Sequence, residues 1–227
     1  MTLSDLPEIQ ITRNIRSTRL RLRVEPTRIR LTAPVFCTKK QIQNFIDQSE
    51  TWLLKTWQAQ QQNIVHVDRT RPTEIQLFNL TQPIQIEYLT QKNNFIFDVE
   101  NMILKISDRT PEKYLKAFVI EYAKEQLPKY LNSVSAEIGL KFTECSIRQP
   151  KTRWGSCSAQ QKIMLNSALV LYNKDVVRYV CVHELAHTVH FNHSAHFWQL
   201  VHKHDVDFQQ NQNVLKKMPT PYWWNSI

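Results

Sequence analysis

The chain has 227 residues, of which 42% are hydrophobic and 22% charged, and its formal net charge is +9. This length is enough for one sizeable core or for two small domains in contact. No stretch approaches the roughly 18 apolar residues of a membrane helix, which excludes a membrane-spanning chain. Because the whole sequence holds only two glycines, nucleotide binding by a glycine-rich phosphate loop is excluded as well.

An arginine-rich segment lies near the start of the chain. Arginine alternates with apolar residues over 19–24 and 28–31, on either side of a turn at 25–27. This period of two predicts a hairpin with one apolar face and one arginine face. The arginine face would attract nucleic acid or another polyanion, although a solvated strand face is the simpler alternative. The residues concerned are Arg19, Arg21, Arg23, Arg28 and Arg30.

The middle of the chain predicts one helix, several strands and a second helix. Thr38 with Gln41 forms a capping box that would begin a helix of about two dozen residues. Alternating apolar residues between 74 and 107 then predict strands. Thr110 and Pro111 predict the cap and first position of a helix that ends near Gly139. We therefore expect an α+β fold, with a β-rich N-terminal subdomain over 1–108 and a catalytic domain over 109–227.

The sequence His183-Glu184-Leu185-Ala186-His187 lies in an apolar stretch. Histidines four residues apart share one face of a helix, so both imidazoles can reach one tetrahedral zinc ion. Glu184 lies beside that face, where its carboxylate can take a proton from a water molecule on the metal. Asn173 is a candidate N-cap for this helix, and Asn192 is a candidate left-handed residue at its end.

The third ligand can be inferred from spacing. On a continuous helix, His190 would lie roughly 10 Å along the axis from His183, which is too far for one ion. His193 follows a possible turn, and its spacing is that of the metzincin pattern, although His190 stands where that pattern has glycine. We therefore favour His193, with His196, in a following predicted helix, as the alternative.

Five motifs occur in a fixed order in the second half of the chain: TRWGSCS at 152–158, LN at 165–166, YVCVHELAH at 179–187, NHS at 192–194 and FW at 197–198. Together they resemble the YgjP-like metallopeptidase family, which is related to the SprT-like and WLM peptidases. The resemblance covers nearly the whole chain, since the arginine-rich hairpin also looks like the family's opening. Two departures are the turn at 159–162, where relatives often have glycine, and His196, where they often have an acidic residue.

The resemblance implies a zincin-like domain in which His183, His187 and His193 bind zinc and Glu184 is catalytic. In related zincins a strand beside the cleft hydrogen-bonds an extended peptide. The candidates for that role here are Trp154, Gly155, Ser156 and Asn166, for which a tight hairpin is an equally good interpretation.

We therefore expect a zinc-dependent metallopeptidase with one Zn²⁺ per chain and a polypeptide substrate. The alternatives are a metal-dependent nucleotide or phosphoanhydride hydrolase and a DNA-associated protein with a regulatory metal site. The four cysteines lack paired spacing and the first ten residues lack a hydrophobic run, so we expect a cytoplasmic protein without disulfides. The sequence leaves the oligomeric state open.

Overall fold

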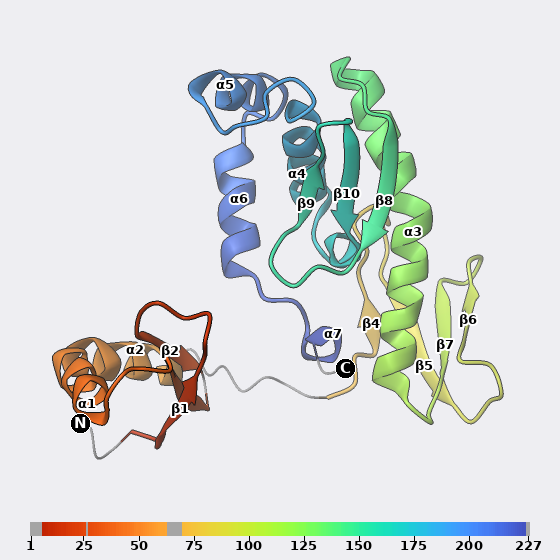
Figure 1. The fold of residues 1–227 in the computed structure, drawn as a ribbon. Helices are drawn as coiled ribbons and strands as arrows, with labels where there is room; N and C mark the ends of the chain where they lie inside the picture. Colours follow the sequence, from red (N-terminus) through yellow and green to blue (C-terminus); the bar gives the residue numbers. More distant parts are fainter. Residues whose placement is uncertain (1–5, 26, 63–69, 226–227) are drawn as a thin grey trace. The chain divides into compact units, whose positions relative to one another are not determined.

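The structure, a computed structural model, describes residues 6–25, 27–62 and 70–225. It divides into two compact units, Met1–Asp68 and Arg69–Ile227. The fold class is α+β, as the sequence predicts, with small mixed sheets and separate helices (Figure 1). None of the described helices is both long and apolar enough to cross a membrane.

The first unit contains the arginine-rich hairpin. Its strands are β1 (Ile9–Arg13), β2 (Arg21–Glu25) and β3 (Arg28–Ala33), in the order β1-β3-β2. The β2–β3 pair is antiparallel, which confirms the predicted hairpin, and β1 adds in parallel to β3. The turn residue Pro26 lies outside the described residues.

Two helices complete the first unit, α1 (Lys39–Gln48) and α2 (Glu50–Gln62), where we expected one. The predicted capping box is present, because Thr38 and Gln41 each accept a hydrogen bond from the other's backbone N–H. The division falls at Ser49, whose N–H donates to the carbonyls at the end of α1. Buried side chains of β3 and the two helices form this unit's core: Ile29, Leu31, Ala33, Ile42, Ile46, Leu53 and Trp57.

The second unit begins with a four-stranded sheet. Its strands are β4 (Glu74–Ile75), β5 (Ile84–Leu89), β6 (Phe95–Asp98) and β7 (Ile103–Ser107), in the order β4-β5-β7-β6. They match the strands predicted between 74 and 107.

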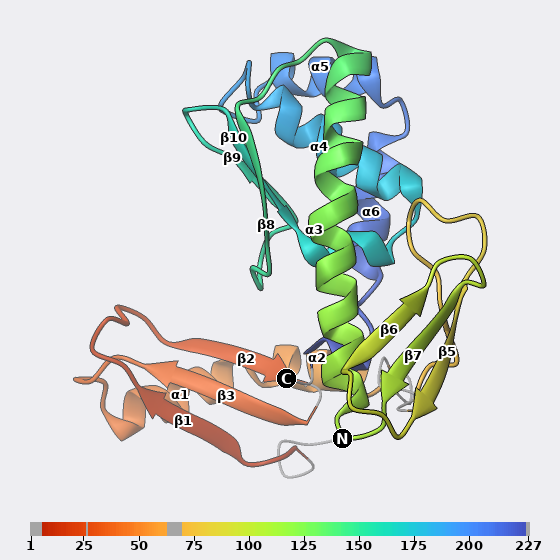
Figure 2. The ribbon, with the colours of Figure 1, turned by 90° about the vertical axis from the view of Figure 1, so that its right-hand side faces the viewer.

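The long helix α3 (Pro111–Ile138) follows, and Figure 2 shows it running beside both sheets of this unit. It begins at Pro111 and ends at the left-handed Gly139 as predicted, whereas Thr110 makes no side-chain capping bond. Buried residues of β5 and β7 share one core with α3. The chain divides into its two compact units between Asp68 and Arg69, whereas the sequence analysis placed a subdomain boundary between 108 and 109.

The remaining elements build the predicted catalytic region. A sheet of order β8-β10-β9 contains β8 (Glu144–Arg148), β9 (Gly155–Cys157) and β10 (Lys162–Asn166). A 3-10 helix, η2 (Ser167–Leu171), leads to α4 (Lys174–Ala186), α5 (Ala195–His204), α6 (Phe208–Lys217) and α7 (Tyr222–Asn225). Strand β9 is an edge strand and lies next to α4. This places one free strand edge beside the HExxH helix.

Candidate active site

The helix α4 carries the first two histidines of the motif. Asn173 caps it as predicted, since its Oδ1 accepts from the N–H of Val176 at 2.9 Å. The helix is buried along most of its length, which fixes the position of its last turn. His183 and Glu184 lie in that turn, and His187 is the C-cap residue, directly after the last helical residue Ala186.

The chain leaves the helix earlier than we expected. The helix ends at Ala186 and is followed by tight turns, in which the N–H of His190 donates to the carbonyl of Ala186 at 3.0 Å. Asn192 does not have positive φ, so the predicted left-handed stop at this residue is wrong. The turns nevertheless bring the chain back toward the helix.

The structure brings His183, His187 and His193 together, with their candidate ligand atoms all within 4.8 Å of one another. The Nε2 atoms of His183 and His193 are 3.2 Å apart. Two nitrogens bound to one tetrahedral zinc at about 2.0–2.1 Å would stand roughly 3.3 Å apart. The cluster therefore fits one ion of this size. His196 lies outside it, exposed on α5 with its ring 6.3 Å from that of His190.

Two neighbours set the orientation of the imidazoles. The Nδ1 of His187 lies 3.0 Å from the carbonyl oxygen of His190, which can only accept, so Nδ1 carries the proton and Nε2 keeps its lone pair. The fully buried Phe197 ring packs against all three imidazoles, with centroid distances of 5.0, 4.5 and 4.9 Å to His183, His187 and His193. The ring positions are thus set by the protein's own contacts.

Burial keeps two of these histidines uncharged. Desolvation lowers the pKa of His183 to about 3, and it also lowers the pKa of His187. A neutral imidazole is the form that binds a metal, so no proton has to be displaced from these rings at neutral pH.

Glu184 is only 5% exposed, and burial raises the pKa of its carboxyl to about 8, against the opposing charge of Arg153. Among the described residues its Oε2 atom is buried without a hydrogen-bond partner. A buried polar atom without a partner is costly, and such atoms gather at functional sites. This carboxyl is therefore available to a ligand in the cleft.

Gly155 lies against that carboxyl. A Cβ atom at this position would stand 2.6 Å from Cγ and 2.7 Å from Cδ of Glu184. Its backbone is not left-handed, so glycine is required here by this close approach and not by an unusual φ.

A cleft of about 260 Å³ opens over this site. Its floor comes from α4, and its sides come from the start of β9 and from α6. The lining residues are Trp154, Gly155, Tyr179, Val180, His183, Glu184, Gln212, Leu215 and Lys216. Trp154 and Gly155 thus stand where we predicted substrate contacts. Tyr179 is buried there, and its hydroxyl oxygen accepts from Gln212 Nε2 at 3.3 Å.

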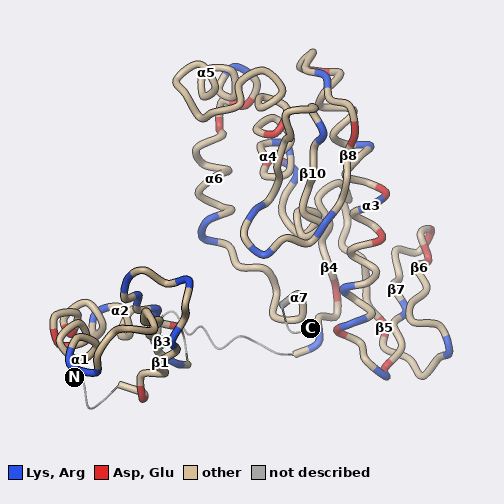
Figure 3. The backbone as a smooth tube through the Cα atoms, viewed as in Figure 1, with Lys and Arg blue, Asp and Glu red and all other residues tan. Residues whose placement is uncertain are grey.

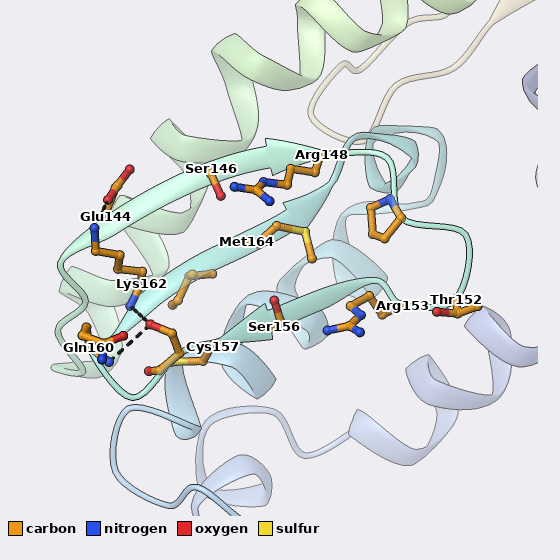
Figure 4. A pocket seen from close by; sticks show the side chains of 13 residues that line it. Glu144, Ser146, Arg148, Thr152, Arg153, Ser156, Cys157, Gln160, Lys162 and Met164 are labelled. Carbon is orange, nitrogen blue, oxygen red and sulfur yellow. Dashed lines mark hydrogen bonds and ion pairs between the residues drawn. The ribbon is translucent and has the colours of Figure 1, made fainter. Parts of the chain in front are cut away.

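The other two predicted substrate contacts lie elsewhere. Ser156 lines a cavity of about 720 Å³ over a sheet face, where it shares a cross-strand row with Ser146 and Met164 (Figure 4). Asn166 is 6% exposed, and its Nδ2 donates to the carbonyls of Pro150 and Arg153, each at 3.0 Å. These hydrogen bonds hold the loop before β9, as expected if Asn166 stabilises a tight hairpin and does not bind substrate.

Comparisons with known proteins identify the family. The model of the YgjP-like metallopeptidase domain matches residues 18–218. The chain belongs to the YgjP-like metallopeptidase family. Among solved structures it is similar to the metallopeptidase zymogen abylysin of Pyrococcus abyssi, with 21% identity over 42% of this chain and 98% of that chain and a TM-score of 0.35. It is also similar to the metallopeptidase zymogen jannalysin of Methanocaldococcus jannaschii, with 20% identity over 41% of this chain and 98% of that chain and a TM-score of 0.34. No curated protein matches the chain.

The arginine face of this YgjP-like chain lies in its first unit (Figure 3). All five predicted arginines are exposed. Arg23 stands directly opposite Arg30 in the hairpin. The Glu25 carboxylate lies 2.6 Å from the guanidinium of Arg28, 4.0 Å from that of Arg23 and 3.9 Å from that of Arg30. One carboxylate therefore faces three guanidinium groups, which leaves an excess of positive charge on this face.

Several site residues of this YgjP-like domain were not predicted from the sequence. Arg153 acts on the charge of Glu184, and Gln212 and Lys216 form a wall of the cleft. Phe197 belongs to the motif FW at 197–198, but the sequence did not predict that its ring contacts every histidine of the cluster. Arg153 and Phe197 lie within the motifs TRWGSCS and FW, which did not indicate their contacts, whereas Gln212 and Lys216 on α6 lie in none of the five motifs.

Proposed function

We propose that this chain is a zinc-dependent metallopeptidase, in which His183, His187 and His193 hold one zinc ion and Glu184 is the general base. The observation that carries the proposal is the 3.2 Å approach of two imidazole Nε2 atoms beside a buried carboxyl without a partner. Three imidazoles form a ligand set that zinc favours, and three protein ligands leave a fourth position open.

When bound, the ion supplies the Lewis acidity that lowers the pKa of water toward about 7 and polarises the scissile carbonyl. Burial raises the pKa of Glu184 to about 8 even with Arg153 lowering it, which favours the protonated form at neutral pH. A further positive charge beside the carboxyl would lower its pKa and favour the carboxylate. In that form it accepts the proton of the attacking water and delivers it to the leaving amine. Its neighbour Gly155 limits where the carboxyl can stand.

We propose that the substrate is a polypeptide bound in extended form along the free edge of β9. An edge strand presents unpaired backbone groups to which a peptide can add as a further strand. Trp154 and Gly155 support this placement, because they line the cleft that also contains His183 and Glu184. We also propose a cytoplasmic location, since the four cysteines are free thiols and burial raises the pKa of Cys145 and Cys157 to about 11.

The first test is the metal content of protein purified without chelators or an affinity tag. We expect about one zinc per chain in the wild type, lost in His193→Ala and retained in His196→Ala. The second variant is a matched control, because His196 lies outside the cluster. No metal in the wild type, even after zinc is supplied, would contradict the proposal.

The second test is hydrolysis of casein, with Glu184→Gln as the inactive control that should keep its metal. Nucleoside triphosphates are assayed in parallel. Phosphate release without peptide cleavage would favour the nucleotide hydrolase. Salt-sensitive DNA binding that survives Glu184→Gln, with no hydrolysis of any substrate, would favour a regulatory site.

A further inference from the structure

A second cavity, of about 520 Å³, adjoins the cleft. Trp154, Leu215 and Lys216 line both spaces. The cavity is bounded by the loop before β9, the end of α6, the segment that follows it, and residues of α3 and α7. A ligand that leaves the cleft past these three shared residues therefore enters this cavity.

The cavity is lined by cations and by no acidic residue. The cations are Lys116, Lys151, Arg153, Lys216 and Lys217. Within residues 70–225, none of them takes part in an ion pair. Arg153 also faces Glu184 in the adjoining cleft, which leaves the four lysines without an acidic neighbour in the lining. Positive charge gathered in such a concave site raises the local concentration of anions.

Two contacts show how these cations are held. Lys116 is half-buried, with its Nζ 5.4 Å from the centre of the Trp224 ring. Lys216 Nζ lies 3.0 Å from Oε1 of Gln212, which is a neutral partner. Both contacts position an ammonium group and neither neutralises it.

The walls of the cavity are fixed by hydrogen bonds. Asn166 holds the loop before β9 through the carbonyls of Pro150 and Arg153. The Tyr172 hydroxyl donates to the carbonyl of Met218 at 2.9 Å, and this bond holds the segment after α6. The cations of the loop and of α6 thus stand on restrained backbone, which reduces the entropy cost of binding an anion.

The strand direction indicates which part of a substrate would reach this cavity. Antiparallel pairing is somewhat more stable than parallel pairing. A peptide antiparallel to β9 runs from the Cys157 end toward Gly155 and then toward Trp154. Its residues C-terminal to the scissile bond would therefore lie at the cationic end.

We propose that this cavity binds carboxylates of the polypeptide substrate on the C-terminal side of the scissile bond. These can be Asp or Glu side chains or the free C-terminal carboxylate. The inference rests on the proposed peptidase function, and it makes the enzyme selective for acidic sequence downstream of the cleavage point.

The experiment uses internally quenched peptides that share one apolar core and differ in the flanking residues. Three peptides carry Asp, Asn or Lys C-terminal to the core, and a fourth carries Asp on the N-terminal side. Each peptide is made with a free and with an amidated C-terminus. This comparison separates the effect of Asp side chains from that of the C-terminal carboxylate. Cleavage positions are read by mass spectrometry, and kcat/KM is measured with zinc-loaded enzyme.

We expect downstream Asp to raise kcat/KM roughly fivefold or more over Asn, since a few exposed ion pairs each contribute a small factor. The preference should fall as salt is added. It should also fall in the double variant Lys151→Gln/Lys217→Gln. The matched control is Lys113→Gln/Lys124→Gln, which changes the charge equally at exposed positions of α3 that line neither space.

Binding of the same peptides to Glu184→Gln, measured by fluorescence anisotropy, separates this inference from the proposed function. Preferential binding of the peptide with Asp C-terminal to its core, without cleavage of any peptide by the wild type, would overturn the proposed function and keep only the carboxylate-binding role of the cavity. Two results would overturn the inference and keep the function. One is cleavage whose kcat/KM does not depend on the charge C-terminal to the core, and the other is an equal loss of the preference for Asp in both double variants. Tighter binding of oligonucleotides than of any peptide, lost in the Lys151 and Lys217 variant, would also overturn it.

Discussion

Gly155→Ala tests whether the edge strand sets the position of the Glu184 carboxyl, the proposed general base. The new Cβ would stand 2.6 Å from Cγ and 2.7 Å from Cδ of Glu184, and nearer still to Oε1. Carbon atoms in ordinary contact are about 3.5–4.0 Å apart, so one partner must move by roughly 1 Å. Glu184 is only 5% exposed and β9 is paired with β10, so neither can move without disturbing packed neighbours.

A displacement of about 1 Å in a catalytic group can cost roughly 100-fold in rate. We therefore expect kcat/KM on a peptide substrate to fall about 100-fold in Gly155→Ala. Overpacking should lower the free energy of unfolding by about 1–3 kcal/mol. Metal content should stay at the wild-type level, because no histidine of the cluster lies among the atoms nearest to this Cβ.

Gly139→Ala is the matched control, since these are the two glycines of the chain. Gly139 has a φ of 73°, and a Cβ there would meet no atom within 4 Å. We expect it to lose about 1–2 kcal/mol of unfolding free energy through backbone strain and to keep its kcat/KM. The assays are steady-state kinetics, elemental analysis and urea unfolding. Unchanged kcat/KM in Gly155→Ala would refute the reasoning.

Three further changes test other parts of the molecule. Arg23→Gln/Arg30→Gln should weaken retention on heparin and lower the salt dependence of binding by about two ions, and equal retention would contradict a polyanion surface. Arg178 lowers the pKa of Glu137 below its ordinary 4.5, so Arg178→Gln should cost up to about 1 kcal/mol in urea unfolding at pH 7. This ion pair stabilises the fold above pH 4.5 and is lost as the pH falls through the lowered pKa, so the difference between wild type and variant should shrink at acid pH. Asn166→Ala removes the donor to the part-buried carbonyls of Pro150 and Arg153 and leaves the buried N–H of Ala168 without its acceptor, so it should cost about 2–3 kcal/mol. A variant as stable as the wild type would refute this structural role.

The elements that were predicted correctly are those with local causes. Alternating residues specify the β2–β3 hairpin, and Pro111 and Gly139 mark the two ends of α3 through their own backbone preferences. The unit boundary had no such signal. It depends on β5 and β7 packing against α3, which is a contact between segments far apart in the sequence. The helix-start signals at Thr110 and Pro111 give no information about that contact.

In the candidate site too, the residues with a local sequence signal were predicted and those that depend on distant segments were not. Helical spacing places His183 beside His187. The distance argument excludes His190, and the spacing after the turn favours His193 while leaving His196 as the alternative. Asn192 was assigned the wrong conformation, because the chain turns through hydrogen bonds that begin at Leu185 and Ala186 and needs no left-handed residue. The cationic cavity could not be predicted, since its lysines come from α3, α6 and a loop far apart in sequence.

The packing of Phe197 against three imidazoles has a practical consequence. In small zinc domains the metal provides the folding energy, so chelators denature them. Here a fully buried aromatic side chain, held in a helix capped by Ser194, arranges the rings before any ion arrives. We therefore expect that the proposed ion can be removed with a chelator and replaced while the protein stays folded. Cobalt or cadmium can then be introduced as a spectroscopic reporter of the three-histidine site.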